Sequence, residues 1–255
     1  MRLTVLGGCG AWPAAGQACS GYLVEHAGFR VLVDPGYAVL PRLLEIIDAG
    51  QVDAVLVSHG HPDHCADLNP LLRARALRDD PAPALPVYAP PGALRAVLAL
   101  DRPGMLDEAI DLREFAPGEG FAAGPLSVRT WLLPHSRPDA GMRLEADGES
   151  LAYTGDTGPS PALDELASGA GVYLAEASYP WEVPADMAEF LSSALQAGAV
   201  AARAGVRKLV LTHLMPGTDQ AEAIQAAASG YDGPIELARV AASRRRLLER
   251  RHPTP

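Results

Sequence analysis

The chain of 255 residues is poor in several features that would define its class at once. It holds three cysteines, Cys9, Cys19 and Cys65, an odd number without a Cys-x-x-Cys pair, which excludes a disulfide scaffold. Its uninterrupted apolar runs are only as long as strands, so none can span a bilayer as a helix. The chain reaches Gly7 too early for the apolar core of a signal peptide, and we therefore expect a cytoplasmic protein.

Lysine is almost absent, because Lys208 stands alone beside twenty arginines, which we interpret as the codon bias of a GC-rich genome. Acidic residues dominate, and the formal net charge is −10. Residues 239–255 hold six arginines and one acid, so residues 1–238 carry −15. Such an acidic body repels polyanions and lacks the basic footprint of a general nucleic-acid binder. The basic end fits either a solvated helix or tail, which we favour, or a contact with nucleic acid or an acidic partner.

Runs typical of strands alternate with runs spaced as in helices, and no segment of disordered composition divides the chain. Strands are expected at 2–6, 21–25, 30–34, 53–58, 87–88, 110–115, 126–133, 141–145, 150–154, 172–175 and 208–212. Helices are expected at 39–47, 68–78, 161–167, 188–204 and 220–228. This order predicts an α/β fold of helices stacked on sheets, formed by one domain over residues 1–238 and followed by the basic segment 239–255.

The densest group of potential metal ligands consists of His59, His61, Asp63 and His64, directly after a predicted buried strand. Neutral imidazoles bind Zn²⁺ at about 2.0–2.1 Å and carboxylates at about 2.0–2.2 Å. Two imidazoles separated by one residue can share an ion, while the following Asp-His pair turns toward a second. The glycine and the proline between these residues supply the freedom and the constraint that the turn requires. A polar loop with incidental histidines is the weaker interpretation, because the strand context also fits.

Three further residues, His135, Asp156 and His213, each follow a predicted strand. Alone, each has an ordinary explanation as a turn histidine, an Asx-turn aspartate or a strand cap. Together with the dense group they account for five of the seven histidines, which a random scatter would not produce. Residues 52–59 and 206–213 also share one pattern, a buried strand, a hydroxyl residue and a histidine. We therefore expect these strand ends to converge on one site.

In this order the ligands resemble the His-x-His-x-Asp-His signature of the metallo-β-lactamase superfamily and the His, Asp and His that follow it. The resemblance implies a four-layered αβ/βα sandwich with two divalent metal ions, Zn²⁺ first and Mn²⁺ or Fe as alternatives. It assigns one ion to His59, His61 and His135 and the other to Asp63, His64 and His213, with Asp156 bridging. It also implies attack by a hydroxide shared between the ions, which makes Asp63 and Asp156 the expected catalytic residues.

Residues 6–13, 20–24 and 175–179 resemble the ribonuclease Z branch of that superfamily. In that branch a long arm that grips tRNA lies between the positions of His135 and Asp156. Here the two positions are 21 apart in the chain, which leaves room only for a hairpin. Together with the acidic body, the short interval makes tRNA an unexpected partner. The compact cyclic-phosphate phosphodiesterases, which lack the arm, are more similar in spacing, and a homodimer is compatible with the resemblance.

Phe190 is a departure from that group, whose members carry at the matching position a histidine that protonates the leaving oxygen. Losing a general acid typically costs about 10²–10⁴-fold for a poor leaving group. Three explanations remain open. The substrate has a good leaving group, or Glu176, Glu189 or Ser192 replaces the acid, or the alignment is displaced by some residues.

Four residues, Asp34, Ser58, Glu176 and Phe190, are expected to support the ligands or to line a substrate pocket. Asp34 precedes a proline, and two interpretations are equally compatible with it: a hydrogen bond to a ligand histidine, or a turn residue.

The sequence thus predicts a dinuclear metal-dependent hydrolase, a phosphodiesterase acting on a small molecule, without membrane attachment. Within enzymes, the alternative is a hydrolase of carboxyl esters, lactones or thioesters. The alternative outside enzymes is a metal-bound sensor or partner-binding protein without turnover. The complete ligand set argues against this last class, because a decayed site usually loses a ligand.

Overall fold

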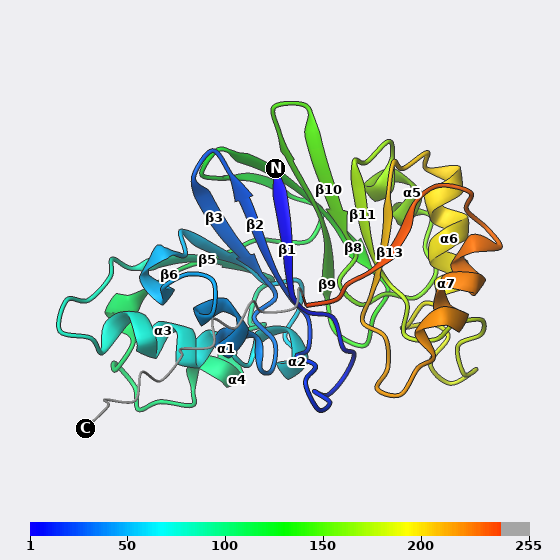
Figure 1. Cartoon of the computed structure of the whole chain (residues 1–255). Coiled ribbons are helices and arrows are strands. Elements are labelled where there is room, and N and C mark those ends of the chain that lie inside the picture. The colour runs from blue at the N-terminus through cyan, green and yellow to red at the C-terminus, as the bar shows by residue number, and fades with distance from the viewer. Residues whose placement is uncertain (241–255) are drawn as a thin grey trace, which may run out of the picture.

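The computed structural model describes residues 1–240, which form two β-sheets with helices on their outer faces (Figure 1). The first sheet contains β1 Arg2–Gly7, β2 Gly21–His26, β3 Phe29–Val33, β4 Ala54–Leu56, β5 Leu85–Ala89 and β6 Ile110–Glu114. The second contains β7 Gly120–Ala123, β8 Leu126–Leu133, β9 Asp139–Ala146, β10 Glu149–Tyr153, β11 Val172–Glu176, β12 Leu209–Thr212 and β13 Ile235–Leu237. The α-helices are α1 Val39–Leu44, α2 Pro62–Cys65, α3 Leu68–Ala76, α4 Arg95–Leu98, α5 Ala162–Ala167, α6 Ala194–Arg203 and α7 Gln220–Ala228, and two 3₁₀ helices lie at Ala49–Gln51 and Asp107–Ala109.

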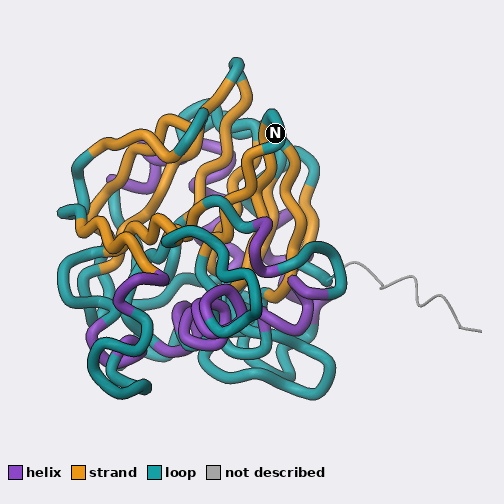
Figure 2. The backbone as a smooth tube through the Cα atoms, turned by 90° about the vertical axis from the view of Figure 1, so that its left-hand side faces the viewer, coloured by secondary structure: helices purple, strands orange, loops and turns teal. Residues whose placement is uncertain are grey.

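Both sheets follow the order of the chain, and each changes from antiparallel to parallel pairing part of the way across. In the first sheet β1 to β3 pair antiparallel and β3 to β6 pair parallel. In the second, β7 to β10 pair antiparallel and β10 to β13 pair parallel. Parallel neighbours need crossover connections, which here contain the helices, so the helices collect on the outer faces. Figure 2 shows the strands gathered toward one end of the molecule and most loops at the other.

The apolar core has three layers, because both faces of each sheet are covered. In β2, Leu23 packs beneath α1 and α3, whereas Tyr22 lies between the two sheets. In β11, Tyr173 packs beneath α5 to α7, whereas Leu174 lies between the sheets. Successive side chains of a strand point to opposite faces, so these two strands supply both layers at once. The arrangement is the four-layered αβ/βα sandwich that the sequence predicts.

Most of the predicted helices and strands are present, but their first and last residues differ from the predictions. The helix expected at 188–204 begins only at Ala194, because Ser193 and Gln196 form a capping box there. The elements without an expected counterpart have four residues or fewer, too short for a periodic pattern, and are α2, α4, β7, β13 and the two 3₁₀ helices. The interval between His135 and Asp156 forms the expected hairpin of β9 and β10.

Within residues 1–240 no helix is both long and apolar enough to cross a membrane. The basic segment 239–255 lies, from residue 241 onward, outside the described residues, so its form stays a prediction.

Candidate metal centre

The loop after β4 carries four of the seven expected ligands. His61 has an extended backbone, and the short helix α2, which begins with Pro62, carries Asp63 and His64. A β-carbon at residue 60 would lie 2.5 Å from the carbonyl oxygen of Ala93, so the loop passes that point only because residue 60 is glycine. The sequence pattern is therefore a tight turn that presents two pairs of ligands.

The other three expected ligands follow strands of the second sheet. His135 follows β8, Asp156 follows β10, and His213 follows β12. His213 has a φ of 55°, in the left-handed region that a non-glycine residue rarely adopts. Such backbone strain persists only where the surrounding structure enforces it, which is common at functional sites.

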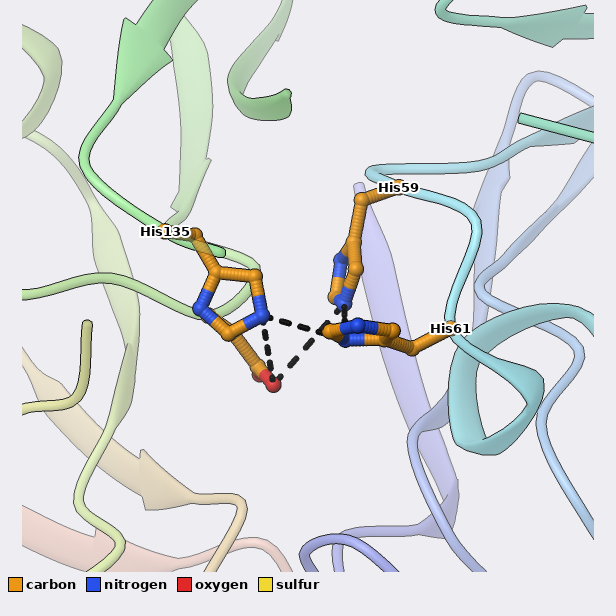
Figure 3. A group of neighbouring side chains, drawn as sticks. His59, His61 and His135 are labelled. Atoms are coloured by element: carbon orange, nitrogen blue, oxygen red, sulfur yellow. Dashed lines mark hydrogen bonds and ion pairs between the residues drawn. The ribbon is translucent and has the colours of Figure 1, made fainter. Parts of the chain in front are cut away.

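His59, His61, His135 and Asp156 form the first ligand group, whose donor atoms all lie within 4.8 Å of one another. Nε2 of His59 lies 3.0 Å from Nδ1 of His61, which lies 3.1 Å from Nε2 of His135. Oδ2 of Asp156 lies 3.9 Å from Nε2 of His59 and 4.0 Å from Nε2 of His135. Figure 3 shows the three imidazoles pointing toward one another.

Asp63, His64, Asp156 and His213 form the second ligand group, and all four residues are buried. Nε2 of His213 lies 3.3 Å from Oδ2 of Asp63 and 3.2 Å from Oδ2 of Asp156. Nε2 of His64 lies 3.2 Å from Oδ1 of Asp156. Asp156 thus belongs to both groups, and each group combines two residues from the loop after β4 with two from the second sheet.

The donor atoms of both groups fit a cation. Nδ1 of His135 donates to the carbonyl oxygen of Phe190 at 2.9 Å, and Nδ1 of His64 donates to Asp34 at 2.8 Å. In each ring Nε2 is therefore the nitrogen that is left to coordinate an ion. Within residues 1–240, Nε2 of His64 and Oδ1 of Asp156 are buried without a well-formed hydrogen bond. Such burial is unfavourable unless an ion lies between the acceptors, and imidazole with carboxylate suits Zn²⁺ and its neighbours. Both clusters are able to bind metal.

The two groups differ in their electrostatics. Burial lowers the pKa of His59 well below its usual value and also lowers that of His61, so both rings stay neutral. Burial opposes the charge on His64 as well, but the carboxylates of Asp156 and Asp34 raise its pKa well above the usual value. Burial acts to raise the pKa of Asp156, yet His213 and His64 hold it well below its usual range. A cation entering the second group therefore displaces a proton.

Asp34 supports the loop after β4 from beneath, with its side chain fully buried and its φ at 49°. It accepts hydrogen bonds from the backbone nitrogen of Ser58 at 2.7 Å, Oγ of Ser58 at 2.6 Å, Nδ1 of His64 at 2.8 Å and the hydroxyl of Tyr153 at 2.7 Å. Of the two sequence interpretations, the geometry favours the contact with a ligand histidine.

His59 has two acceptors behind it. Oγ of Ser58 lies 3.0 Å from its Nδ1, and Oδ1 of Asp139 lies 2.9 Å from the same atom. The sequence analysis did not single out Asp139, which is fully buried at the start of β9. Burial, with Asp156 and Asp34 nearby, raises the pKa of Asp139 well above its usual value. Only its position two residues before the strand predicted at 141–145, which follows His135, could have drawn attention to it.

Glu176 and Phe190 lie close to the centre. Neither side chain forms a hydrogen bond with one of the seven expected ligand side chains. Glu176 is 1% exposed at the end of β11 and accepts from Thr157, Ser178 and Ser192. Burial, together with the charge of Asp156, raises its pKa to about 8. Phe190 contributes its backbone carbonyl, which holds His135.

Solvent reaches the centre from the side of the first group, where His61 and His135 are only partly buried. A cavity of about 380 Å³ lies between the loops after β1, β12 and β13. Cys9, Leu214 and Arg239 are among its lining residues, and Leu214 directly follows the ligand His213.

Two layers of sheet, covered by helices and meeting at a pair of His/Asp clusters, define a metal-dependent hydrolase fold. A family model described as a beta-lactamase superfamily domain matches residues 29–214. The chain belongs to this superfamily, in its metallo-β-lactamase fold, as the sequence resemblance implies.

Two relatives and one solved structure illustrate the family. An uncharacterized protein of Mycobacterium tuberculosis is 36% identical, covering 92% of this chain and 88% of its own. A protein named ribonuclease Z, from Mycobacterium marinum, is 33% identical, covering 93% of this chain and 95% of its own. The crystal structure of the metallo-β-lactamase fold protein YhfI from Bacillus subtilis superposes with a TM-score of 0.85 at 27% identity, covering 94% of this chain and 97% of that chain.

Proposed function

We propose that the protein is a phosphodiesterase that hydrolyses a small molecule with the help of two divalent metal ions, most simply Zn²⁺. The observation that carries this proposal is the pair of ligand groups that share Asp156. One ion would be held by His59, His61 and His135, the other by Asp63, His64 and His213, and both by Asp156. When bound, two such ions lower the pKa of water and neutralise charge that develops on the attacked phosphoryl group.

We assign to Asp63 the role of accepting the proton of the attacking water. Burial acts to raise its pKa, but the hydrogen bond from His213 holds it below the usual value, so the carboxylate is ionised and can accept a proton. Asp156 lies between both groups and fixes their spacing. Asp34, Ser58 and Asp139 hold the rings of His59 and His64 in the orientation that directs Nε2 to the centre.

The short β9–β10 hairpin between His135 and Asp156 supports the proposal of a small substrate. A ribonuclease Z relative acts, by its name, on RNA. In this chain the β9–β10 hairpin fills the interval, and residues 1–238 carry −15, which repels a polyanion. We therefore assign tRNA no role as substrate.

A substrate panel with metal analysis tests the proposal. The panel contains bis(4-nitrophenyl) phosphate, cyclic nucleotides, lactones, acyl thioesters and a precursor tRNA, and metal is counted in protein prepared without chelators. We expect about two ions per chain, hydrolysis of phosphodiesters and no cleavage of tRNA. His61→Ala and Asp156→Ala should abolish hydrolysis, whereas Asp111→Asn on the exposed edge strand β6 should not.

Several results would contradict the proposal. Protein without bound metal would refute the dinuclear centre. Turnover confined to lactones or thioesters would move the enzyme to another ester class, and full metal occupancy without any turnover would favour a sensor or partner-binding protein. Fast hydrolysis of phosphodiesters with poor leaving groups would show that Phe190 does not limit the chemistry.

A further inference from the structure

A buried carboxylate in the second sheet has no assigned part in the chemistry above. Glu176 is 1% exposed at the end of β11, and no arginine or lysine within residues 1–240 forms an ion pair with it. A carboxylate at such a position is unfavourable unless donors compensate for lost water. It has three donors, the hydroxyl of Ser178 at 2.7 Å, the backbone nitrogen of Ser192 at 3.1 Å and the backbone nitrogen of Thr157.

The first of these contacts leads to a metal-ligand histidine. Oγ of Ser178 lies 3.0 Å from Nδ1 of His213, and Ser178 is fully buried. Because the hydroxyl proton of Ser178 is donated to Glu176, its oxygen accepts the proton of Nδ1. Nε2, which faces Asp63 and Asp156 and shares its proton with Asp63 in the absence of an ion, is then the atom left to coordinate a metal ion.

The first sheet contains the same order of groups. Oγ of Ser58 donates to Asp34 at 2.6 Å and lies 3.0 Å from Nδ1 of His59. Each sheet thus places a buried carboxylate, a serine hydroxyl and a ligand imidazole in series. The recurrence in both sheets favours a positioning role over a chance contact.

The remaining contacts of Glu176 reach the other ligands of the second sheet. Thr157 directly follows Asp156 in the chain. Oγ of Ser192 donates to the carbonyl oxygen of Thr157 at 2.6 Å, and Phe190, two residues before Ser192, holds His135 through its carbonyl. One carboxylate therefore connects the three loops that carry the ligands of this sheet.

We propose that Glu176 and Ser178 are positioning residues: Ser178 fixes the tautomer and orientation of His213 for the second metal ion, and Glu176 fixes the loops of both ligand groups. This inference rests on the proposed dinuclear centre. Ser178 serves one group only, whereas Glu176, through Thr157 beside the shared Asp156, serves both.

Competition between the protein and a chelating dye for Zn²⁺ tests the proposal without any substrate. The wild type should give two dissociation constants, which are assigned to the two groups by titrating His61→Ala and His64→Ala. Ser178→Ala should weaken the constant of the His213 group by about 10–100-fold and leave the other unchanged. Glu176→Gln should weaken both. Ser178→Thr, which keeps the hydroxyl, should restore the wild-type value, and Ser127→Ala on the exposed face of β8 serves as the matched control.

The outcomes separate this inference from the proposed function. Absence of Zn²⁺ binding in the wild type refutes the dinuclear centre itself. Two wild-type constants that Ser178→Ala leaves unchanged overturn the positioning role alone. Ser178→Ala could instead weaken Zn²⁺ binding at both groups equally and lower the melting temperature measured by circular dichroism. In that case the serine acts on folding, and the proposal is also wrong. A Co²⁺ titration gives a second readout, because only the absorption of the His213 group should change in Ser178→Ala.

Discussion

Replacing Asp34 by asparagine tests whether a fully buried hydrogen-bond network controls the metal centre. Oδ2 of Asp34 accepts from Ser58, His64 and Tyr153, while Oδ1 accepts from the backbone nitrogen of Ser58. An amide keeps one acceptor oxygen but presents NH₂ to donors on the other side. The left-handed φ of 49° is tolerated by asparagine, so the backbone has no reason to change.

The expected magnitude follows from the contacts that are lost. At least one buried donor then faces the NH₂ group of the asparagine, which is itself a donor and cannot accept. Such an unsatisfied donor costs about 1–3 kcal/mol of stability. Removing the charged partner of a ligand histidine typically costs about 10–100-fold in metal affinity, or about 1.4–2.8 kcal/mol. We expect the larger loss in the group of His64, which Asp34 contacts directly, and the smaller loss at His59, which it reaches through Ser58.

The assay is Zn²⁺ competition together with thermal melting, and the chain offers a matched control. Asp147→Asn also changes an aspartate with a left-handed φ, here 48°, but its side chain is 85% exposed, and its hydrogen bond within residues 1–240 is with His26. The control should bind metal and melt like the wild type. If Asp34→Asn binds both ions as tightly as Asp147→Asn, the network does not orient the ligands and the reasoning is refuted.

Three further predictions concern the ions themselves. Asp156→Ala removes the ligand common to both groups, so metal analysis should find neither ion, whereas His61→Ala should retain the second; two ions in Asp156→Ala would contradict the shared role. Removing metal with a chelator should lower the melting temperature, since each ion at a free concentration of about 100 Kd contributes about 2.7 kcal/mol; an unchanged melting curve would speak against binding. Zn²⁺ affinity of the second group should fall as the pH falls, because the pKa of His64 is raised well above its usual value and a proton competes with the ion; a titration series independent of pH would disprove this competition.

The grouping of these His and Asp side chains was predictable from the sequence because each segment that carries them comes after a strand. Strand ends of a sandwich meet at one edge, so position after a strand is nearly enough to place a residue at the site. His59 and His213 show this well, since β4 and β12 belong to different sheets and their following histidines still converge. The family resemblance then supplied the pairing of ligands into two groups.

The supporting residues were less predictable, for physical reasons that differ between them. Asp139 contacts His59 across 80 positions of the chain, and no local pattern encodes such a contact. Phe190 acts through its carbonyl, which every residue type possesses. Ser178 did leave a signal, since it stands two residues after Glu176, a spacing that places side chains on one side of an extended segment.

Each ligand group combines two residues from the loop after β4 with two from the second sheet, and this has a consequence for the chain as a whole. A cut in the connection between β6 and β7, at 115–119, would give one fragment with His59, His61, Asp63 and His64 and another with His135, Asp156 and His213. Neither fragment alone would hold a complete coordination sphere. The concentration of free Zn²⁺ would then control whether the two pieces reassemble, which makes the centre a metal-dependent switch for fragment complementation.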